Sequence, residues 1–202
     1  GAEKVPEFLV WCDDLGVKMV TLYLLSTDNL AGRPAAELTE LFDIIGNLAE
    51  NIGTFRNWKI KHVGADDVLP PDLLVRLLSV EEKTVNNSGL HVNLAIGYGG
   101  RAEIADAVRS IIAEHEAAGG TLDNLAEKLT TKLIGDHLYT GGLPDPDLVI
   151  RTSGEQRLSD FMLWQSAHSE FYFVEALYPD LRQVDFLRAM RDFTRRERRF
   201  GS

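Results

Sequence analysis

The stretch Asp147-Leu-Val-Ile-Arg-Thr-Ser-Gly-Glu-Gln-Arg-Leu-Ser159 joins a short apolar run to a dense group of polar side chains. Residues 148–150 are continuously apolar, which is the pattern of a strand buried on both faces. Arginine, hydroxyl and glycine residues follow at once, among them Arg151, Arg157 and Ser159. Guanidinium and hydroxyl groups donate strong hydrogen bonds to phosphate oxygens. The stretch therefore predicts a diphosphate-binding loop at the end of a buried strand.

Each of these polar residues, taken alone, has an ordinary explanation in a surface ion pair, such as one between Arg151 and Glu155. As a group they favour an anion site. A second apolar run starts at Glu170 and continues through Phe173. A carboxylate at that position is a candidate ligand for Mg²⁺, which prefers oxygen ligands and bridges phosphates.

Length and composition narrow the class of protein. A chain of 202 residues is within the range of one domain, and no apolar run is long enough to cross a bilayer. The formal net charge of −10 argues against a nucleic-acid binder, although local arginines can still bind an anionic substrate. The single cysteine, Cys12, cannot form an internal disulfide and suits a reducing cytoplasm. We expect a cytoplasmic protein with at most peripheral membrane contact.

Apolar periodicity predicts strands that alternate with helices along the chain. Strands are expected at 17–25, 58–64, 90–98 and 148–150, and helices at 2–15, from Pro34 to Phe55, from Pro70, from Arg101 to Ile112, after Thr121 and over 184–193. A polar loop is expected directly after the first strand, at 26–29. This alternation predicts an α/β fold in a single domain, with a mostly parallel sheet flanked by helices.

Polar segments follow three of the predicted strands. They are Ser26-Thr-Asp-Asn29, Tyr98-Gly-Gly-Arg101 and Arg151–Arg157. Ligands of such sheets bind outside the carboxyl ends of the strands, so these segments should converge on one rim. Gly97–Ala102 also fits the loose dinucleotide fingerprint. The acidic strand end that the fingerprint requires does not follow, which leaves a nucleotide-binding oxidoreductase as the weaker alternative.

Three segments together carry a resemblance to a known family. Ile150–Ser159, Leu163-Trp-Gln-Ser-Ala167 and Ser169-Glu-Phe-Tyr-Phe173 closely resemble the signature of the cis-prenyltransferases, which are the undecaprenyl, decaprenyl and Z-farnesyl diphosphate synthases. The resemblance covers nearly the whole chain. It implies a homodimeric enzyme that condenses isopentenyl diphosphate with an allylic diphosphate and forms a cis double bond. It also implies an apolar tunnel for the growing product, with Mg²⁺ and arginines stabilising the departing diphosphate.

The resemblance assigns roles by position. Isopentenyl diphosphate would be held by Arg151, Arg157 and Ser159, and Mg²⁺ by Glu170. The residues placed beside the reacting carbons are Ser26 and Asn29. Arg33 is assigned to substrate binding, although Gly32 matches the family position equally well.

The basic C-terminus has two readings. Arg199-Phe-Gly201 matches the terminal Arg-x-Gly motif of the family, which reaches across the homodimer interface towards the partner's substrate. A solvated basic helix end is the alternative.

Leu24 bears on product length. Many long-chain members of the family have a small residue at this position, whereas short-chain Z-farnesyl synthases show Tyr-Leu-Leu-Ser-Thr, as residues 23–27 do. A leucine here would narrow the tunnel, so we expect a short, farnesyl-sized product. The apolar stripes of helices 34–55 and 72–80 either line such a tunnel or pack as ordinary core against the sheet.

One family element has no counterpart in residues 1–202. The family's first strand carries an Asp-Gly-Asn-x-Arg-Trp motif, with the catalytic aspartate and the loop for the allylic diphosphate. We therefore expect either a cis-prenyltransferase whose segment with this strand and loop lies outside residues 1–202, or a non-catalytic partner subunit of the same fold. The intact 147–170 motif favours the first reading.

Overall fold

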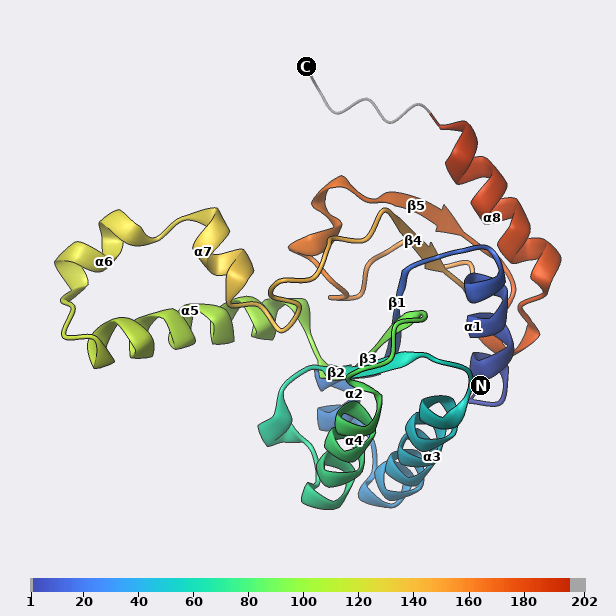
Figure 1. The fold of residues 1–202 in the computed structure, drawn as a ribbon, viewed down its shortest axis with the longest axis horizontal. Coiled ribbons are helices and arrows are strands. Elements are labelled where there is room, and N and C mark those ends of the chain that lie inside the picture. The colour runs from blue at the N-terminus through green and yellow to red at the C-terminus, as the bar shows by residue number, and fades with distance from the viewer. Residues whose placement is uncertain (1, 197–202) are drawn as a thin grey trace.

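The computed structural model describes residues 2–196, without the side chains of residues 122 and 123 (Figure 1). Its elements are α1 (Lys4–Asp14), β1 (Met19–Ser26), α2 (Thr27–Gly32), α3 (Ala35–Thr54), β2 (Lys59–Val63), α4 (Pro71–Thr84), β3 (His91–Tyr98), α5 (Gly100–Ala117), α6 (Leu122–Lys128), α7 (Thr131–Asp136), β4 (Leu148–Arg151), β5 (Glu170–Phe173) and α8 (Gln183–Arg195). Short 3-10 turns lie at Asp66–Val68, Gln165–His168 and Tyr178–Asp180.

The strands form two parallel groups. β3 lies between β1 and β2 in a three-stranded sheet, and β4 pairs with β5 alone. Every pairing within residues 2–196 is parallel. β3 is the most deeply buried strand, with Leu94 and Ile96 fully inaccessible, as its continuous apolar sequence requires. The predicted α/β fold with a parallel sheet is confirmed.

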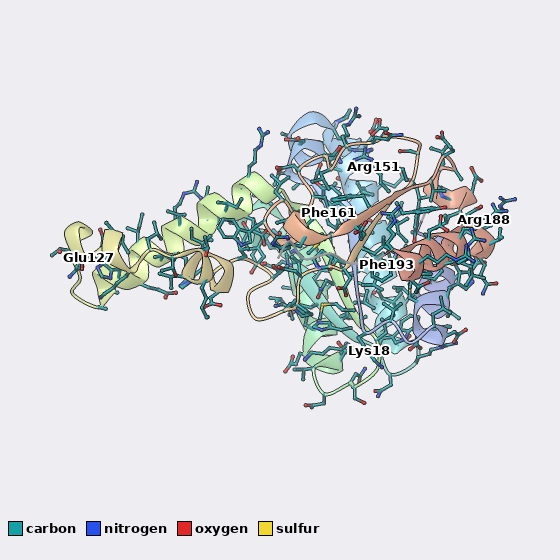
Figure 2. All side chains as sticks on the ribbon, turned by 90° about the horizontal axis from the view of Figure 1, so that it is seen from above. Lys18, Glu127, Arg151, Phe161, Arg188 and Phe193 are labelled. Atoms are coloured by element: carbon teal, nitrogen blue, oxygen red, sulfur yellow. The ribbon has the colours of Figure 1, made fainter. Side chains whose placement is uncertain are left out.

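Helices flank the strands. α3 and α4 lie side by side against β2, and α1 lies next to α8 (Figure 1). α3 buries Ile45, Leu48, Ala49 and Ile52, one face of a helix with 3.6 residues per turn. Helices α5, α6 and α7 form an arm that extends from the body, with Glu127 near its tip (Figure 2).

One local prediction was wrong. The expected loop at 26–29 is instead the start of α2, and Ser26 caps it by accepting a hydrogen bond from the backbone N–H of Asn29 at 3.0 Å. No element was predicted at residues 131–136, where Thr130 caps α7 by accepting from the N–H of Leu133 at 3.1 Å. In both segments a hydroxyl residue begins a short helix.

No helix between residues 2 and 196 is both long enough and apolar enough to cross a bilayer.

Candidate functional site

A cavity of about 1510 Å³ lies between the two groups of strands. Its lining includes every residue of β1 from Met19 to Leu24 and all of β4, but only Asn93 from β3 and only Phe171 and Phe173 from β5. Successive side chains of a strand point to opposite faces. A cavity lined by consecutive residues therefore runs along the edges of β1 and β4 that have no pairing partner in the described part of the chain, not beneath one face of a sheet.

One end of this cavity is polar. The polar residues that line it include Ser26, Thr27, Asp28 and Asn29 from the end of β1 and the start of α2, Arg101 at the start of α5, Arg151 at the end of β4, and Thr152, Ser153, Arg157, Ser159 and Asp160 after β4. These segments are far apart in the sequence. They come together because the carboxyl ends of parallel strands share one edge. The predicted convergence of the strand ends is confirmed.

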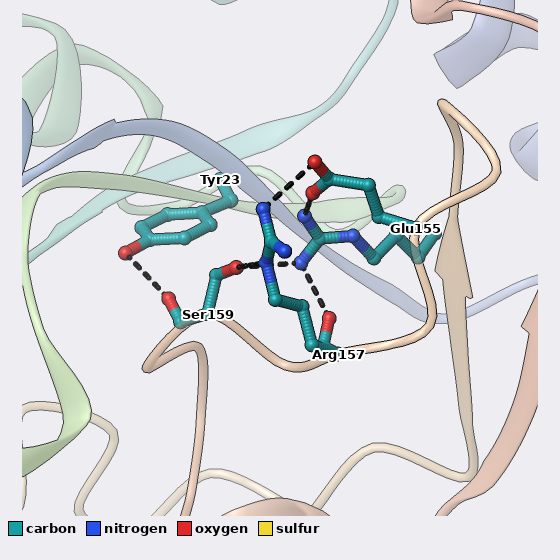
Figure 3. A network of polar contacts seen from close by, with 5 residues as sticks. Tyr23, Glu155, Arg157 and Ser159 are labelled. Carbon is teal, nitrogen blue, oxygen red and sulfur yellow. Dashed lines mark hydrogen bonds and ion pairs between the residues drawn. The ribbon is translucent and has the colours of Figure 1, made fainter.

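Arg151 and Arg157 share two acceptors, the Glu155 carboxylate and the Ser159 hydroxyl oxygen, which Figure 3 labels together with Arg157. Arg151 donates to the hydroxyl oxygen of Ser159 at 2.9 Å, to the carbonyl of Arg157 and to the carboxylate of Glu155. Arg157 donates to the other carboxylate oxygen of Glu155 at 2.7 Å and, more weakly, to the Ser159 hydroxyl at 3.4 Å. The guanidinium groups therefore converge, as the anion-site prediction required.

The loop that carries these residues is held in an unusual conformation. Ser153, Ser159, Asp160 and Met162 all have positive φ angles, between 47° and 76°. Left-handed conformations of such residues cost free energy and persist where the surrounding contacts hold them. The loop is thus shaped by the rest of the fold.

The two glycines after β3 allow that loop to approach. Gly100 donates its N–H to the carbonyl of Asp160 at 2.7 Å, and the Asp160 carboxylate accepts the N–H of Arg101 at 3.1 Å. A Cβ on Gly100 would lie 2.9 Å from the Asp160 carbonyl oxygen. The start of α5, where a dinucleotide phosphate would bind, is therefore occupied by the protein's own loop, and the oxidoreductase alternative loses its support.

Tyr23 and Phe161 belong to the site but were not among the predicted residues. Their rings stack with centroids 4.7 Å apart, and both line the cavity. The Tyr23 hydroxyl lies 3.4 Å from the carbonyl oxygen of Ser159, and burial raises its pKa. In the sequence, the one feature that could have pointed to Tyr23 was its position beside Leu24 near the end of a predicted strand.

The remainder of the cavity wall is largely apolar. Leu24 lines it as predicted, together with Leu41, Ile44, Ile45 and Leu48 of α3, Val5 and Phe8 of α1, and Met190 of α8. The stripe of α4 does not contribute, because Leu73, Leu77 and Val80 are buried in the core. Of the two stripes considered, α3 faces the cavity and α4 is ordinary core.

Other predicted residues lie away from this cavity. Glu170 pairs with Leu148 at the first residues of β5 and β4, whereas Arg151 is at the last residue of β4. The Glu170 carboxylate accepts a hydrogen bond from Arg196 at 2.6 Å. Arg33 is exposed and lies 3.8 Å from Glu37. Arg199 and Gly201 lie outside the described residues.

A metal site does not form from the described side chains alone. No group of three histidine, cysteine, aspartate or glutamate residues between 2 and 196 is arranged to hold a metal ion. The structure does not bring Glu170 to the arginines, so its proposed Mg²⁺ role gains no support within one chain.

A cluster of buried polar side chains lies next to the site and connects the segments that carry it. Glu103, with 1% exposure, accepts from the Tyr98 hydroxyl at 2.5 Å and from the Gln165 amide at 3.0 and 3.1 Å. Gln165 also donates to the Thr140 hydroxyl at 2.8 Å. The cluster ties the end of β3 and the start of α5 to the segment that follows the arginine loop. Burial raises the pKa of Glu103.

Comparison with known proteins gives consistent matches. A family model described as "Putative undecaprenyl diphosphate synthase" matches residues 1–201. The "(2Z,6E)-farnesyl diphosphate synthase" of Thermobifida fusca is 56% identical over 201 residues, covering 100% of this chain and 78% of that protein. "Isoprenyl transferase 1" of Streptomyces avermitilis is 53% identical over 202 residues, again covering 100% and 78%.

Solved structures show the same similarity. Lavandulyl diphosphate synthase from Lavandula x intermedia, in complex with dimethylallyl diphosphate, superposes with a TM-score of 0.89 at 32% identity, covering 100% of this chain and 86% of that one. A "probable undecaprenyl diphosphate synthase" from Campylobacter jejuni gives a TM-score of 0.84 at 29% identity, covering 99% and 91%.

The buried carboxyl of Glu103 predicts a pH-dependent stability. Because its pKa is raised in the folded chain, its stabilising contribution is complete below the unfolded-state pKa of about 4.3 and is lost as pH rises through the folded-state pKa. We expect the free energy of unfolding of the wild type to fall, relative to that of Glu103→Gln, as the pH rises from about 4 towards neutrality. Urea unfolding at a series of pH values measures this.

Glu116→Gln is the matched control, because Glu116 lies exposed on the same helix. Its difference from the wild type should vary little with pH. A Glu103→Gln difference that stayed constant over the same range would contradict the linkage.

Proposed function

The chain belongs to the prenyltransferase family of undecaprenyl diphosphate synthase-like enzymes and is a cis-prenyl diphosphate synthase, and we propose that it joins isopentenyl diphosphate to an allylic diphosphate to give a short, farnesyl-sized product. It is therefore a transferase of isoprenoid biosynthesis. The observation that carries the proposal is the convergence of Arg151, Arg157 and Ser159 at the polar end of a largely apolar cavity. The alternative, a non-catalytic partner subunit, is not favoured.

The arginine loop suits the diphosphate of isopentenyl diphosphate. A guanidinium has five N–H donors, and the bonds to Glu155, Ser159 and the Arg157 carbonyl use three of those of Arg151. The remaining donors of both arginines are available to diphosphate oxygens. Fixed positive charge and oriented donors stabilise the negative charge that develops as a diphosphate leaves. Ser26 and Asn29 line the same cavity and are proposed to lie beside the reacting carbons.

Mg²⁺ is part of the proposal through its chemistry with diphosphate. When bound, it would neutralise phosphate charge, usually with one or two carboxylates, phosphate oxygens and waters as ligands. Glu170 does not fit this role in the single chain, because it lies at the far end of β5 and pairs with Arg196.

The cavity passes between the edges of β1 and β4, and we call this gap the strand slot. The slot supports the expectation that the family's first strand lies outside residues 1–202. Among residues 2–196 neither edge has a pairing partner, both strands run parallel to their neighbours, and Ala2 lines the same cavity. We propose that an extended segment carrying the family's Asp-Gly-Asn motif enters here as a central strand. It would pair with both edges through main-chain hydrogen bonds and bring the catalytic aspartate to the polar rim.

Assembly and location complete the proposal. We propose a homodimer in which Arg199 and Gly201 reach the partner's substrate. We also propose a cytoplasmic location, with at most peripheral membrane contact and no nucleic-acid partner, because Cys12 is free and the net charge is −10.

Removal of the Arg151 side chain tests the site. Arg151→Ala should lower kcat/KM for isopentenyl diphosphate about 100-fold or more, because donors aimed at developing charge are lost. Condensation of labelled isopentenyl diphosphate with several allylic primers measures this, in protein that also carries the segment with the Asp-Gly-Asn motif. Arg109→Ala is the control, since Arg109 is 71% exposed on α5 and pairs with Asp106. Wild-type kinetics in Arg151→Ala would refute the assigned role.

Leu24 tests the proposed product length. Leu24→Ala should lengthen the product, because it removes a side chain from the cavity wall. Chromatography of the dephosphorylated products measures chain length. Leu78→Ala, at an exposed position of α4 outside the cavity lining, should leave the product unchanged. The proposed role of Leu24 fails if both variants give the wild-type distribution.

The strand slot predicts a change in hydrogen exchange. The part of the Thermobifida fusca protein that lies outside the match can be fused to this chain. We expect the fusion to slow hydrogen exchange at backbone amides of β1 and β4, because their edges would then be paired with a further strand. Mass spectrometry of deuterium uptake measures this, with the amides of β3, which is already paired on both sides, as the internal control. Unchanged uptake in β1 and β4 would count against the slot.

A further inference from the structure

Glu155 connects the two arginines through one carboxylate. One oxygen accepts from Arg157 at 2.7 Å and the other accepts from Arg151 (Figure 3). The hydroxyl oxygen of Ser159 also accepts from both guanidinium groups, at 2.9 and 3.4 Å. Two shared acceptors thus hold two cationic side chains in one arrangement.

Such an arrangement needs an anionic partner. Two like charges held close together repel each other, and the repulsion is stronger where water is partly excluded. Arg157 is 67% exposed and Arg151 only 22%, so Arg157 in particular has room to swing away. A carboxylate between them offsets the repulsion and restricts the rotamers of both.

The residues that line the cavity show on which side of the two arginines the Glu155 carboxylate lies. Arg151, Arg157 and Ser159 are among the residues that line the large cavity, and Glu155 is not. Two residues with positive φ, Ser153 at 76° and Gly154 at 69°, turn the chain just before Glu155. The carboxylate therefore binds the arginines from outside the cavity and leaves their remaining donors for a ligand inside it.

We propose that Glu155 is a positioning residue that holds Arg151 and Arg157 as a two-arginine clamp for the diphosphate of the substrate. The inference rests on the proposed function, which it deepens by naming the group that keeps the cationic site assembled. Glu155 itself does not touch the diphosphate. It acts through the orientation of the two guanidinium groups.

The direction in which Glu155→Gln changes the affinity for pyrophosphate tests this proposal. Removal of a nearby negative charge, by itself, would tighten the binding of an anion. Loss of a positioning carboxylate does the opposite, because the arginines separate. We therefore expect Glu155→Gln to raise the Kd for inorganic pyrophosphate on the order of tenfold, as for lost hydrogen bonds to charged groups. Isothermal titration calorimetry measures this after circular dichroism has confirmed the fold.

Three further variants sharpen the result. Glu82→Gln, at an exposed position of α4, is the charge-matched control and should bind pyrophosphate as the wild type does. Glu155→Asp keeps the charge and should recover part of the affinity. In an Arg157→Ala background the effect of Glu155→Gln should shrink, because the residue through which it acts is absent.

Each result of these binding measurements either supports or overturns the proposal. Unchanged or tighter binding by Glu155→Gln overturns the positioning role. Tighter binding would in addition show that Glu155 opposes the ligand. Equal binding by the wild type and Arg151→Ala, including no binding by either, overturns the clamp itself. If the expected pattern appears with pyrophosphate but a protein that also carries the segment with the Asp-Gly-Asn motif does not turn over isopentenyl diphosphate, the clamp stands and the proposed function fails.

Discussion

The site depends on two guanidinium groups held close together at the end of a short buried strand. Arg151 is fixed by β4, and Arg157 returns to it along a loop with several left-handed residues. Like charges repel, so this geometry requires shared acceptors, which Glu155 and Ser159 supply. The result is a local concentration of positive charge on a chain whose net charge is −10.

The rest of the fold supports that loop from several directions. Gly100 accepts its close approach, and Asp160 satisfies the N-terminus of α5. Beneath it, Glu103 joins β3 and α5 to Gln165 through buried hydrogen bonds. Such buried polar clusters specify one arrangement when their groups are paired. The loop thus gains its conformation from contacts that are distant in the sequence.

The cavity combines two environments that the reaction class needs. Its polar end is suited to diphosphate, and its apolar wall, with Leu24 and the inner face of α3, is suited to an isoprenoid chain. The cavity runs along the edges of β1 and β4 that have no partner strand among residues 2–196. Its shape therefore depends on how the strands pair, as well as on the size of the substrate.

The sequence alone determined the parallel α/β fold, the family and the arginine loop, because apolar periodicity and a long local motif are properties of neighbouring residues. It also indicated that the strand ends would meet. Only the tertiary structure decided that α3, not α4, lines the cavity, and that Glu170 and Arg33 lie away from the arginines. It also decided that Tyr23 lies beside them and that Glu155 binds Arg157 as well as Arg151. The physical reason is that a side chain's partners depend on how separate elements pack, which local patterns do not encode.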